Sequence, residues 1–371
     1  MRFEHLYIHV PFCARRCVYC DFAIAVRSAI PVDVYRAALE RELEQRHDRV
    51  TLDLATVYMG GGTPSKLGAE GIVRLMDVVR RRATIRADAE VTIEVNPEDV
   101  TAAVVRAWAD AGVNRLSIGV QSFDDAVLKW MHRTHDSAAA RRAVRVARDA
   151  GVSNVSLDLI FAAPSTLNRD WPADLDAALS LEPAHLSVYG LTVEERTPLG
   201  RWVARQTIDE APEETFAHEF SVAHRTLTSA GFEHYEVSNY GRPGTQSRHN
   251  WAYWQRARYA GVGPSAHEFN GATRRWNKDA YVQWEEAVAG GVDPSAGSEL
   301  LDARQVAAEA TYLGLRTSAG VPVSAPDTPY LEPWLEAGWA RVDGSVVRLT
   351  PDGWLRLDSL AIALTQARSR Y

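Results

Sequence analysis

The sequence predicts an α/β fold, with a parallel sheet in the first 205 residues and an α+β region after it. Short strand-like runs alternate with helix-like segments through the first two hundred residues, and their connections are short. After about residue 205 a long helix-like segment over 213–230 begins a different pattern. The length of 371 residues also exceeds that of most single domains, so we expect more than one.

Six short apolar runs are the expected parallel strands. They cover residues 5–10, 55–59, 90–95, 115–120, 154–161 and 185–191. After Pro31, apolar residues recur at steps of three and four beside Arg and Glu, which predicts an amphipathic helix. The same pattern predicts helices over 99–111, 138–150 and 169–181. In such a sheet, flat or curled, functional loops lie at the carboxyl ends of the strands.

The last third of the chain carries weaker signals. A polar loop is expected over 238–247, and Trp251, Trp254 and Trp276 form an aromatic stretch that is either core or the wall of a flat-ligand pocket. Residues 302–371 read as helix, Gly-Val turn, helix, short strands over 340–349 and a final helix, an order similar to a winged helix. We therefore expect domains over 1–205, 206–300 and 301–371.

The composition argues against several classes of protein. There are 41 Lys and Arg against 48 Asp and Glu, a formal charge of -7, which disfavours nucleic-acid binding driven by bulk charge. The C-terminal module has mixed charges and no basic recognition helix. No run approaches 18 apolar residues, and Met1 leads into a strand-like segment rather than a secretion signal. We expect a cytoplasmic protein; attachment to a membrane through a partner is left open.

The three cysteines of the chain, Cys13, Cys17 and Cys20, lie within eight residues directly after the first predicted strand. Three thiolates at this spacing can hold three irons of a cubane cluster and leave the fourth iron without a protein ligand. Other interpretations are a structural zinc site, a disulfide with a spare thiol, or three buried cysteines. Zinc loops usually contain two separated pairs, and a disulfide requires an oxidising compartment.

Polar residues mark the ends of the later strands. Gly60 to Ser65 follow the second strand, and three successive glycines let a backbone approach a ligand closely, although a tight turn is the alternative. Glu94, Gln121 and Asp158 lie in the next three strands, where a buried polar group needs a ligand or a satisfied network. Arg133 is either a partner for a ligand carboxylate or a surface residue.

These motifs together resemble the radical S-adenosylmethionine (SAM) superfamily, and within it the HemN/HemW group of oxygen-independent coproporphyrinogen oxidase-like proteins. The resemblance covers nearly the full length. It is carried by Tyr7-Ile-His-Val-Pro-Phe-Cys13, Cys17-Val-Tyr-Cys20-Asp-Phe22, the Gly60 to Ser65 loop, Glu94-Val-Asn-Pro, Arg115-Leu-Ser-Ile-Gly-Val-Gln121-Ser-Phe and Asp158-Leu-Ile-Phe. One departure is Ala162-Ala163-Pro164, where the group usually has Gly-x-Pro; we expect the extra methyl groups to be tolerated.

The resemblance implies a partial (β/α)6 TIM-like barrel that holds a 4Fe–4S cluster and SAM. It implies that Cys13, Cys17 and Cys20 ligate the cluster. The residues that it places around SAM are Tyr7, Tyr19, Gly61, Gly62, Thr63, Glu94, Gln121, Arg133 and Asp158.

Two features separate the oxidases of this group from its haem-handling members. Phe22 stands where the oxidases resemble one another in having a fourth cysteine. The run from His249 to Trp254 matches a His-Asn-x-x-Tyr-Trp pattern associated with haem in HemW-like proteins, which implies haem contacts for His249, Asn250, Tyr253 and Trp254. The alternative is an interface cluster in which His249 and Asn250 bond the backbone and the tryptophans are core.

The resemblance therefore implies a haem chaperone that binds the cluster and SAM, takes up haem and delivers it to recipient haemoproteins. A homodimer is left open. The alternative function is a radical SAM enzyme, either an oxygen-independent coproporphyrinogen III oxidase or a radical methyltransferase. A zinc-stabilised barrel with a DNA-binding tail is a further alternative. No catalytic residue is assigned, and the sequence does not identify the recipient or the electron donor.

Overall fold

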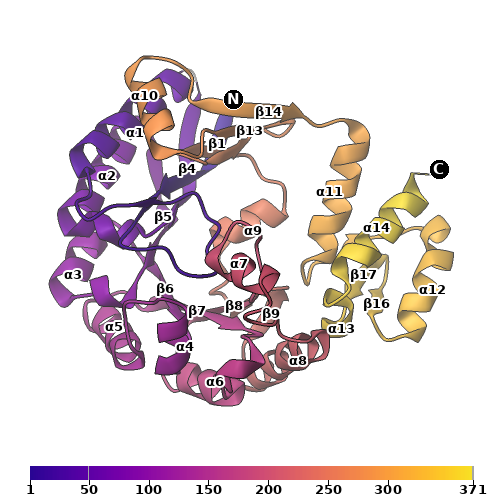
Figure 1. The fold of residues 1–371 in the computed structure, drawn as a ribbon. Coiled ribbons are helices and arrows are strands. Elements are labelled where there is room, and N and C mark those ends of the chain that lie inside the picture. The colour runs from indigo at the N-terminus through magenta and orange to yellow at the C-terminus, as the bar shows by residue number, and fades with distance from the viewer. Residues whose placement is uncertain (49, 370–371) are drawn as a thin grey trace.

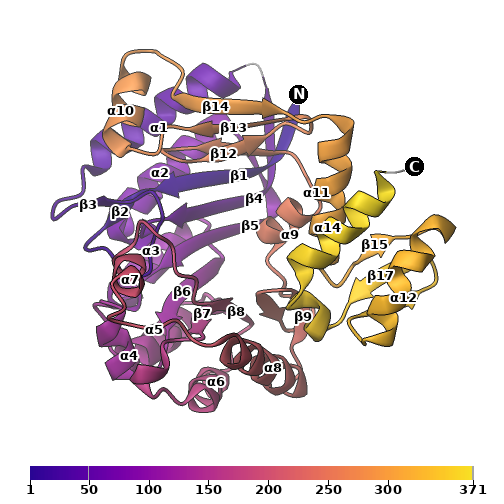
Figure 2. The same cartoon turned by 45° about the vertical axis from the view of Figure 1, so that its right-hand side comes forward.

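The computed structural model describes residues 1–48 and 50–369, and a curled sheet with helices on its outer side dominates it (Figures 1 and 2). Within the described residues this sheet has twelve strands. Their order across the sheet is β14 (Ser295–Leu300), β13 (Thr273–Asn277), β12 (His267–Phe269), β11 (Tyr259–Val262), β1 (Arg2–Val10), β4 (Thr51–Gly61), β5 (Thr84–Val95), β6 (Arg115–Gln121), β7 (Asn154–Phe161), β8 (His185–Gly190), β10 (Asn239–Gly241) and β9 (Glu233–Glu236). Strands β11, β1 and β4 to β8 are parallel, as expected for a partial barrel.

Helices follow the parallel strands and cover the outer face of the sheet (Figure 1). They are α1 (Val32–His47), α2 (Gly68–Arg82), α3 (Ala102–Asp110), α4 (Asp125–Trp130), α5 (Ser137–Asp149), α6 (Trp171–Leu179) and α8 (Glu213–Ser229). Helix α7 (Pro198–Ala204) lies instead beside the cysteine loop, where the Leu199 N–H donates to the Val18 carbonyl. Side-chain caps set several starts: Thr101, Asp136 and Asp170 each accept a backbone N–H of the first turn. The alternation of strands and capped helices confirms the predicted α/β class.

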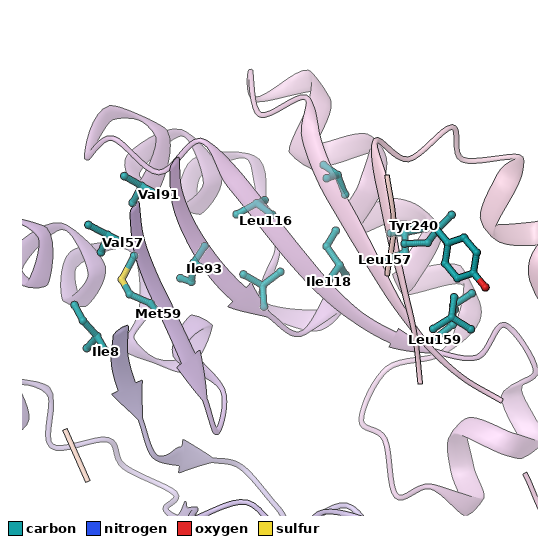
Figure 3. Packing of buried hydrophobic residues seen from close by; sticks show 14 of the residues in the cluster. Ile8, Val57, Met59, Val91, Ile93, Leu116, Ile118, Leu157, Leu159 and Tyr240 are labelled. Carbon is teal, nitrogen blue, oxygen red and sulfur yellow. The ribbon is translucent and has the colours of Figure 1, made fainter. Parts of the chain in front are cut away.

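The two faces of the parallel sheet differ in chemistry. On the face beneath the helices, buried aliphatic side chains form rows across neighbouring strands, as Ile8, Met59 and Ile93 do (Figure 3). The alternate positions point to the barrel interior, and here Tyr58 and Glu94 meet by a hydrogen bond. The outer rows therefore stabilise the barrel, and the inner positions are free for polar and aromatic groups.

The predicted strands are present, but the loop expected over 238–247 was wrong in part. It contains β10, whose backbone pairs antiparallel with β8 and β9. Strand pairing through the backbone does not require apolar side chains, so the polar composition hid this strand. Strands β4 and β5 also begin earlier than expected, at Thr51 and Thr84, in charged segments.

Residues 206–300 add strands to both edges of the same sheet. Strands β9 and β10 extend the β8 edge, and β11 to β14 extend the β1 edge. Besides α8, the described part of this segment contains the helices α9 (Arg248–Trp254) and α10 (Tyr281–Ala289). A domain boundary after residue 205 stays a prediction.

The cysteine loop carries the short parallel pair β2 (Phe12–Cys13) and β3 (Ala25–Val26). The single-turn 3₁₀ helices η1 (Pro64–Leu67), η2 (Pro97–Asp99) and η3 (Ser165–Leu167) follow strands β4, β5 and β7.

The C-terminal region packs beside the barrel near β9 and α8 (Figure 2). It contains α11 (Ala303–Leu315), β15 (Val321–Pro322), η4 (Ala325–Asp327), α12 (Thr328–Glu336), β16 (Ala340–Asp343), β17 (Val346–Leu349), α13 (Pro351–Trp354) and α14 (Leu357–Arg368). The predicted helices and strands occur in this order, with β15, η4 and α13 in addition, and the likeness to a winged helix stays a prediction. Among the described residues, no helix has the length and apolar character needed to span a membrane.

Candidate functional site

A cavity of about 470 Å³ lies at the carboxyl ends of β4 to β8. One side of it is the cysteine loop between β2 and β3, and the other sides are strand ends. The residues predicted for the cluster and SAM that line this cavity are Cys13, Cys17, Cys20, Tyr19, Gly61, Gly62, Thr63, Glu94, Gln121, Arg133 and Asp158. Tyr7 does not line it and faces a neighbouring cavity instead. Residues that are far apart in sequence thus meet at one end of the barrel.

The three cysteines are free thiols on the wall of this cavity. Cys13 Sγ lies 3.3 Å from Thr63 Oγ1, and Arg133 Nη1 donates to Cys17 Sγ at 3.5 Å. Burial raises the pKa of the Cys20 thiol to about 11, so the thiol is protonated at neutral pH, and a bound metal cation would favour its thiolate form. No three His, Cys, Asp or Glu side chains in the described residues converge on one ion. A cubane does not demand this, because each thiolate binds a different iron. The donors therefore fit a cluster better than a single zinc ion.

The glycine loop after β4 packs too closely for side chains. Gly61 has a φ of 110°, and a Cβ there would lie 2.5 Å from the His9 ring. A Cβ on Gly62 would lie 2.6 Å from the carbonyl oxygen of Pro11, one residue from the cysteine loop. The glycines thus allow the loop to pass directly over the end of β1.

Two buried carboxyl groups face the cavity. Glu94 accepts hydrogen bonds from the Tyr58 hydroxyl at 2.8 Å and from the Gly61 N–H at 3.0 Å. Burial raises the pKa of Glu94 to about 7 despite these donors. Asp158 accepts from Ser117 Oγ at 2.9 Å, and burial raises its pKa to about 6. A cation bound here would favour the ionised forms, so the pair is suited to an ammonium group.

Arg133 is part of the cavity wall rather than a free surface residue. Its Nη2 donates to Asn96 Oδ1 at 2.7 Å and to the Gly119 carbonyl at 2.8 Å. Gln121 has a φ of 67°, a left-handed conformation that turns the chain at the end of β6. The turn places the Gln121 side chain on the wall beside this guanidinium. A ligand carboxylate would find a fixed positive charge there.

Sequence reasoning missed several lining residues, namely Tyr58, Asn96, Arg115, Ser117 and Tyr189. Arg115 is 2% exposed and has no ion pair in the described part of the chain. Strand alternation offered a signal for two of them, since Asn96 lies two residues after Glu94 and Ser117 lies four residues before Gln121. The place of Tyr58, Arg115 and Tyr189 on the cavity wall depends on which strands are neighbours in the sheet.

The departure from the family pattern after β7 is visible in the backbone. Ala162 has a φ of 56°, a left-handed conformation that glycine adopts without strain. Its N–H donates to Glu219 Oε2 at 2.6 Å, and Arg169 pairs with the same carboxylate at 2.8 Å. This hydrogen bond to α8 helps hold the alanine in the conformation.

A second cavity of about 910 Å³ adjoins the first. Asn250, Tyr253 and Trp254, which lie on α9, line it together with Tyr7. Both cavities share a wall formed by Tyr58, Glu94, Tyr189 and Asn250, with Asp21, Phe22 and Gly61 at its edge. Ligands in the two cavities would therefore be neighbours.

His249 does not line either of these cavities. It is fully buried, with Nδ1 2.6 Å from Thr56 Oγ1 and Nε2 2.8 Å from the Tyr253 hydroxyl. Burial lowers its pKa far below the usual value. Both ring nitrogens are thus engaged, and the side chain orients Tyr253. The structure places its three predicted companions on the cavity wall and His249 behind them.

Comparison with known proteins identifies the family. Residues 7–178 match the Radical SAM superfamily. A Mycobacterium tuberculosis (strain H37Rv) protein named Heme chaperone HemW is 36% identical over 366 residues, which is 97% of this chain and 94% of the relative. The chain belongs to the HemW family. The Bacillus subtilis (strain 168) member, which has the same printed name, is 35% identical over 85% of this chain and 84% of its own. Membership of the Radical SAM superfamily implies a 4Fe–4S cluster and SAM.

The fold is shared with a solved structure of another member of the superfamily. Coproporphyrinogen III oxidase (HemN) from Escherichia coli superposes with a TM-score of 0.84 over 98% of this chain and 90% of its own. The sequence identity is 23%, so this similarity shows the fold alone. It confirms the predicted radical SAM barrel.

Proposed function

We propose that this protein is a haem chaperone that binds a 4Fe–4S cluster and SAM, takes up haem and delivers it to recipient haemoproteins. The observation that carries the proposal is the 36% identity over 97% of the chain with proteins named Heme chaperone HemW. Phe22 in place of a fourth cysteine supports it. The second, aromatic-lined cavity offers space for a flat macrocycle beside the first.

In the first cavity, Cys13, Cys17 and Cys20 would hold the cluster, whose fourth iron would be left for SAM. Such a cluster supplies one-electron chemistry when it is bound. Glu94 and Asp158 would accept hydrogen bonds from the ligand, and the Arg133 guanidinium would face its carboxylate. Tyr19, Gly61, Gly62, Thr63 and Gln121 would complete the wall, with Tyr7 behind it.

In the second cavity, Asn250, Tyr253 and Trp254 would contact haem. His249, predicted from the motif as a haem contact, would support Tyr253 through the hydrogen bond to its hydroxyl.

Haem titration of the anaerobically reconstituted protein tests the chaperone function. We expect a saturable shift of the haem absorbance, followed by transfer of haem to an added apo-haemoprotein and no conversion of coproporphyrinogen III. Formation of protoporphyrinogen would identify an oxidase and overturn the proposal. A protein that neither binds nor transfers haem would also overturn it.

A further inference from the structure

Two histidines line the second cavity, His9 and His267. The ring of His9 is engaged, because Nδ1 lies 3.1 Å from the Tyr7 hydroxyl and Nε2 lies 3.0 Å from the Ala23 carbonyl oxygen. His267 is exposed, and its ring has no hydrogen-bond partner among the described residues. Partial burial and the nearby Arg274 lower its pKa, which favours the neutral imidazole that binds metals. His267 is thus the available imidazole on this wall.

Strand β12 gives His267 a defined direction. Side chains alternate along a strand, so His267 and Phe269 face the cavity while Glu268 faces the opposite side. The ring of His267 stacks on Trp276 of the adjacent strand, with centroids 5.9 Å apart and an interplanar angle of 25°. The imidazole is therefore supported on one side and open on the other.

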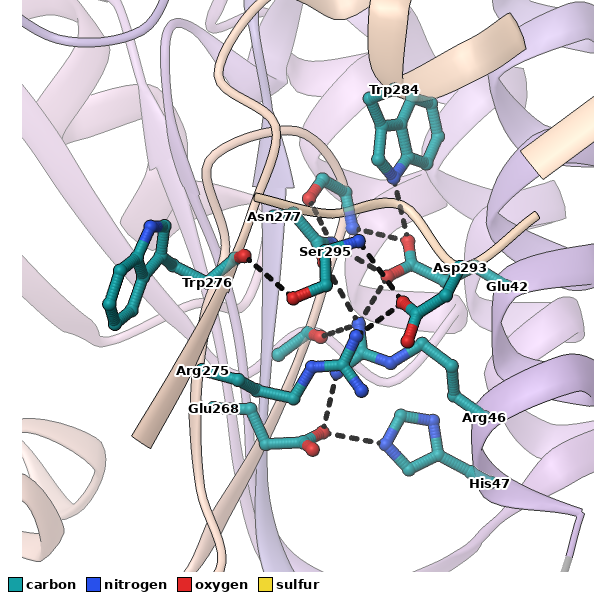
Figure 4. Close-up of polar contacts among 12 residues, drawn as sticks. Glu42, Arg46, His47, Glu268, Arg275, Trp276, Asn277, Trp284, Asp293 and Ser295 are labelled. Carbon is teal, nitrogen blue, oxygen red and sulfur yellow. Dashed lines mark hydrogen bonds and ion pairs between the residues drawn. The ribbon is translucent and has the colours of Figure 1, made fainter. Parts of the chain in front are cut away.

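A buried polar network fixes the other face of β12 (Figure 4). Glu268 Oε2 accepts hydrogen bonds from His47 at 2.8 Å and pairs with Arg46 at 3.1 Å, both on α1. Residue Asn277 donates its backbone N–H to the Ala266 carbonyl at 3.0 Å. The residues on both sides of His267 are thus tied to the barrel, so its position is determined before any ligand binds.

The same cavity has a cationic side. Arg256, Arg274 and Arg316 line it. Arg256 and Arg274 share one carboxylate, Glu309, and Arg256 Nη2 is buried without a hydrogen-bond partner in the described residues. Arg316 pairs with Glu236 at 3.1 Å and lies over the Trp254 ring at 4.4 Å. A guanidinium group that keeps one nitrogen without a hydrogen-bond partner in the described residues, beside aromatic rings, is suited to an anionic substituent of a flat ligand.

We propose that the second cavity binds haem with His267 as the protein ligand of the iron and Arg256 facing a propionate. This proposal rests on the proposed function and assigns the iron to a residue outside the His249 to Trp254 motif. Trp254, Tyr253 and Tyr259 would contact the macrocycle.

The test is a titration of ferric haem into the full-length protein and its variants, followed by absorbance and electron paramagnetic resonance. We expect His267→Ala to lose the absorbance shift of the ligated iron and at least about tenfold in affinity, or about 1.4 kcal/mol. Metal-free protoporphyrin IX should bind this variant as it binds the wild type, and added imidazole should restore the haem spectrum. His249→Gln removes the competing motif histidine, and we expect a folded His249→Gln to keep the absorbance shift. The matched control is His218→Ala, which replaces an exposed histidine outside both cavities and should bind haem as the wild type does.

A wild-type spectrum in His267→Ala would overturn this assignment and leave the chaperone function standing. If the shift is lost in a folded His249→Gln and kept in His267→Ala, the assignment to His267 is also overturned. The iron ligand would then be His249 of the His249 to Trp254 motif. Absence of binding by the wild type would overturn both proposals.

A second measurement tests the propionate side. Arg256→Ala should weaken binding of protoporphyrin IX but not of its dimethyl ester, which lacks the charges. Arg258→Ala, an exposed arginine outside the cavity, is the control and should change neither. Equal weakening of the acid and the ester in Arg256→Ala would contradict the assignment of this residue.

Discussion

Glu42 on α1 is the centre of the buried network that holds β11 to β13 against the barrel, and removing its carboxylate should destabilise the fold strongly. The side chain is fully buried and pairs with Arg46. It also accepts hydrogen bonds from the Gly263 N–H at 2.8 Å, Asn277 Nδ2 at 2.7 Å and Trp284 Nε1 at 2.9 Å. Breaking a buried pair by deleting one partner costs about 3–5 kcal/mol. We expect Glu42→Ala to lose about this much of the free energy of unfolding, since three further donors also lose their acceptor.

Urea unfolding followed by circular dichroism measures the loss. Glu40→Ala is the matched control, because Glu40 lies on the same helix but pairs with Arg36 and Arg81 near the surface. Surface pairs contribute about 0–1 kcal/mol, so the control should unfold close to the wild type. If Glu42→Ala and Glu40→Ala unfold at the same urea concentration, and the dependence of their free energies of unfolding on urea is unchanged, the reasoning is refuted.

Three further predictions concern the first cavity. Cys20→Ser should lower the iron content after anaerobic reconstitution from about four per chain and remove the cluster absorbance, and full iron loading would contradict the ligand assignment. Gly62→Ala should disturb the cysteine loop through the Pro11 carbonyl and cost more than about 1 kcal/mol in urea unfolding, whereas wild-type stability would show that the loop can shift. The pKa of Glu94 is raised to about 7, so its protonation on going from pH 7.5 to 6 should weaken SAM binding measured by calorimetry. Glu94→Gln should bind SAM more weakly at both pH values and lose this pH dependence. If the pH dependence of SAM binding in Glu94→Gln is the same as in the wild type, another group titrates.

The parallel strands could be predicted from the sequence because their apolar runs are continuous and their connecting helices periodic. The antiparallel additions could not. Strand β12 spans His267–Phe269 and β14 reads Ser-Ala-Gly-Ser-Glu-Leu, so neither has an apolar run of useful length. Their place in the sheet depends on the pairing of β11 with β1, where Tyr259 lies opposite His5 across a long sequence separation, and one sequence does not reveal this pairing.

The same distinction applies to the site. Cys13, Cys17 and Cys20 are close in sequence, so the motif itself placed them together. Arg115 and Tyr58 reach the cavity only because alternate residues of neighbouring strands face the barrel interior, and this depends on register. His267 belongs to none of the sequence motifs, because its proposed role depends on the cavity that β12 faces.

Glu94 links the two cavities physically, because it belongs to the wall that they share. Its carboxylate bonds Tyr58 and Gly61, and burial raises its pKa to about 7. A cationic ligand in the first cavity would stabilise the negative charge of Glu94. This charge would then act on a ligand bound in the second cavity, on the other side of Tyr58. Because coupling between two binding equilibria is reciprocal, a ligand in the second cavity would alter affinity in the first by the same factor. The position of one buried carboxyl group would therefore give the proposed haem uptake and SAM binding a common electrostatic element, without any movement of the barrel.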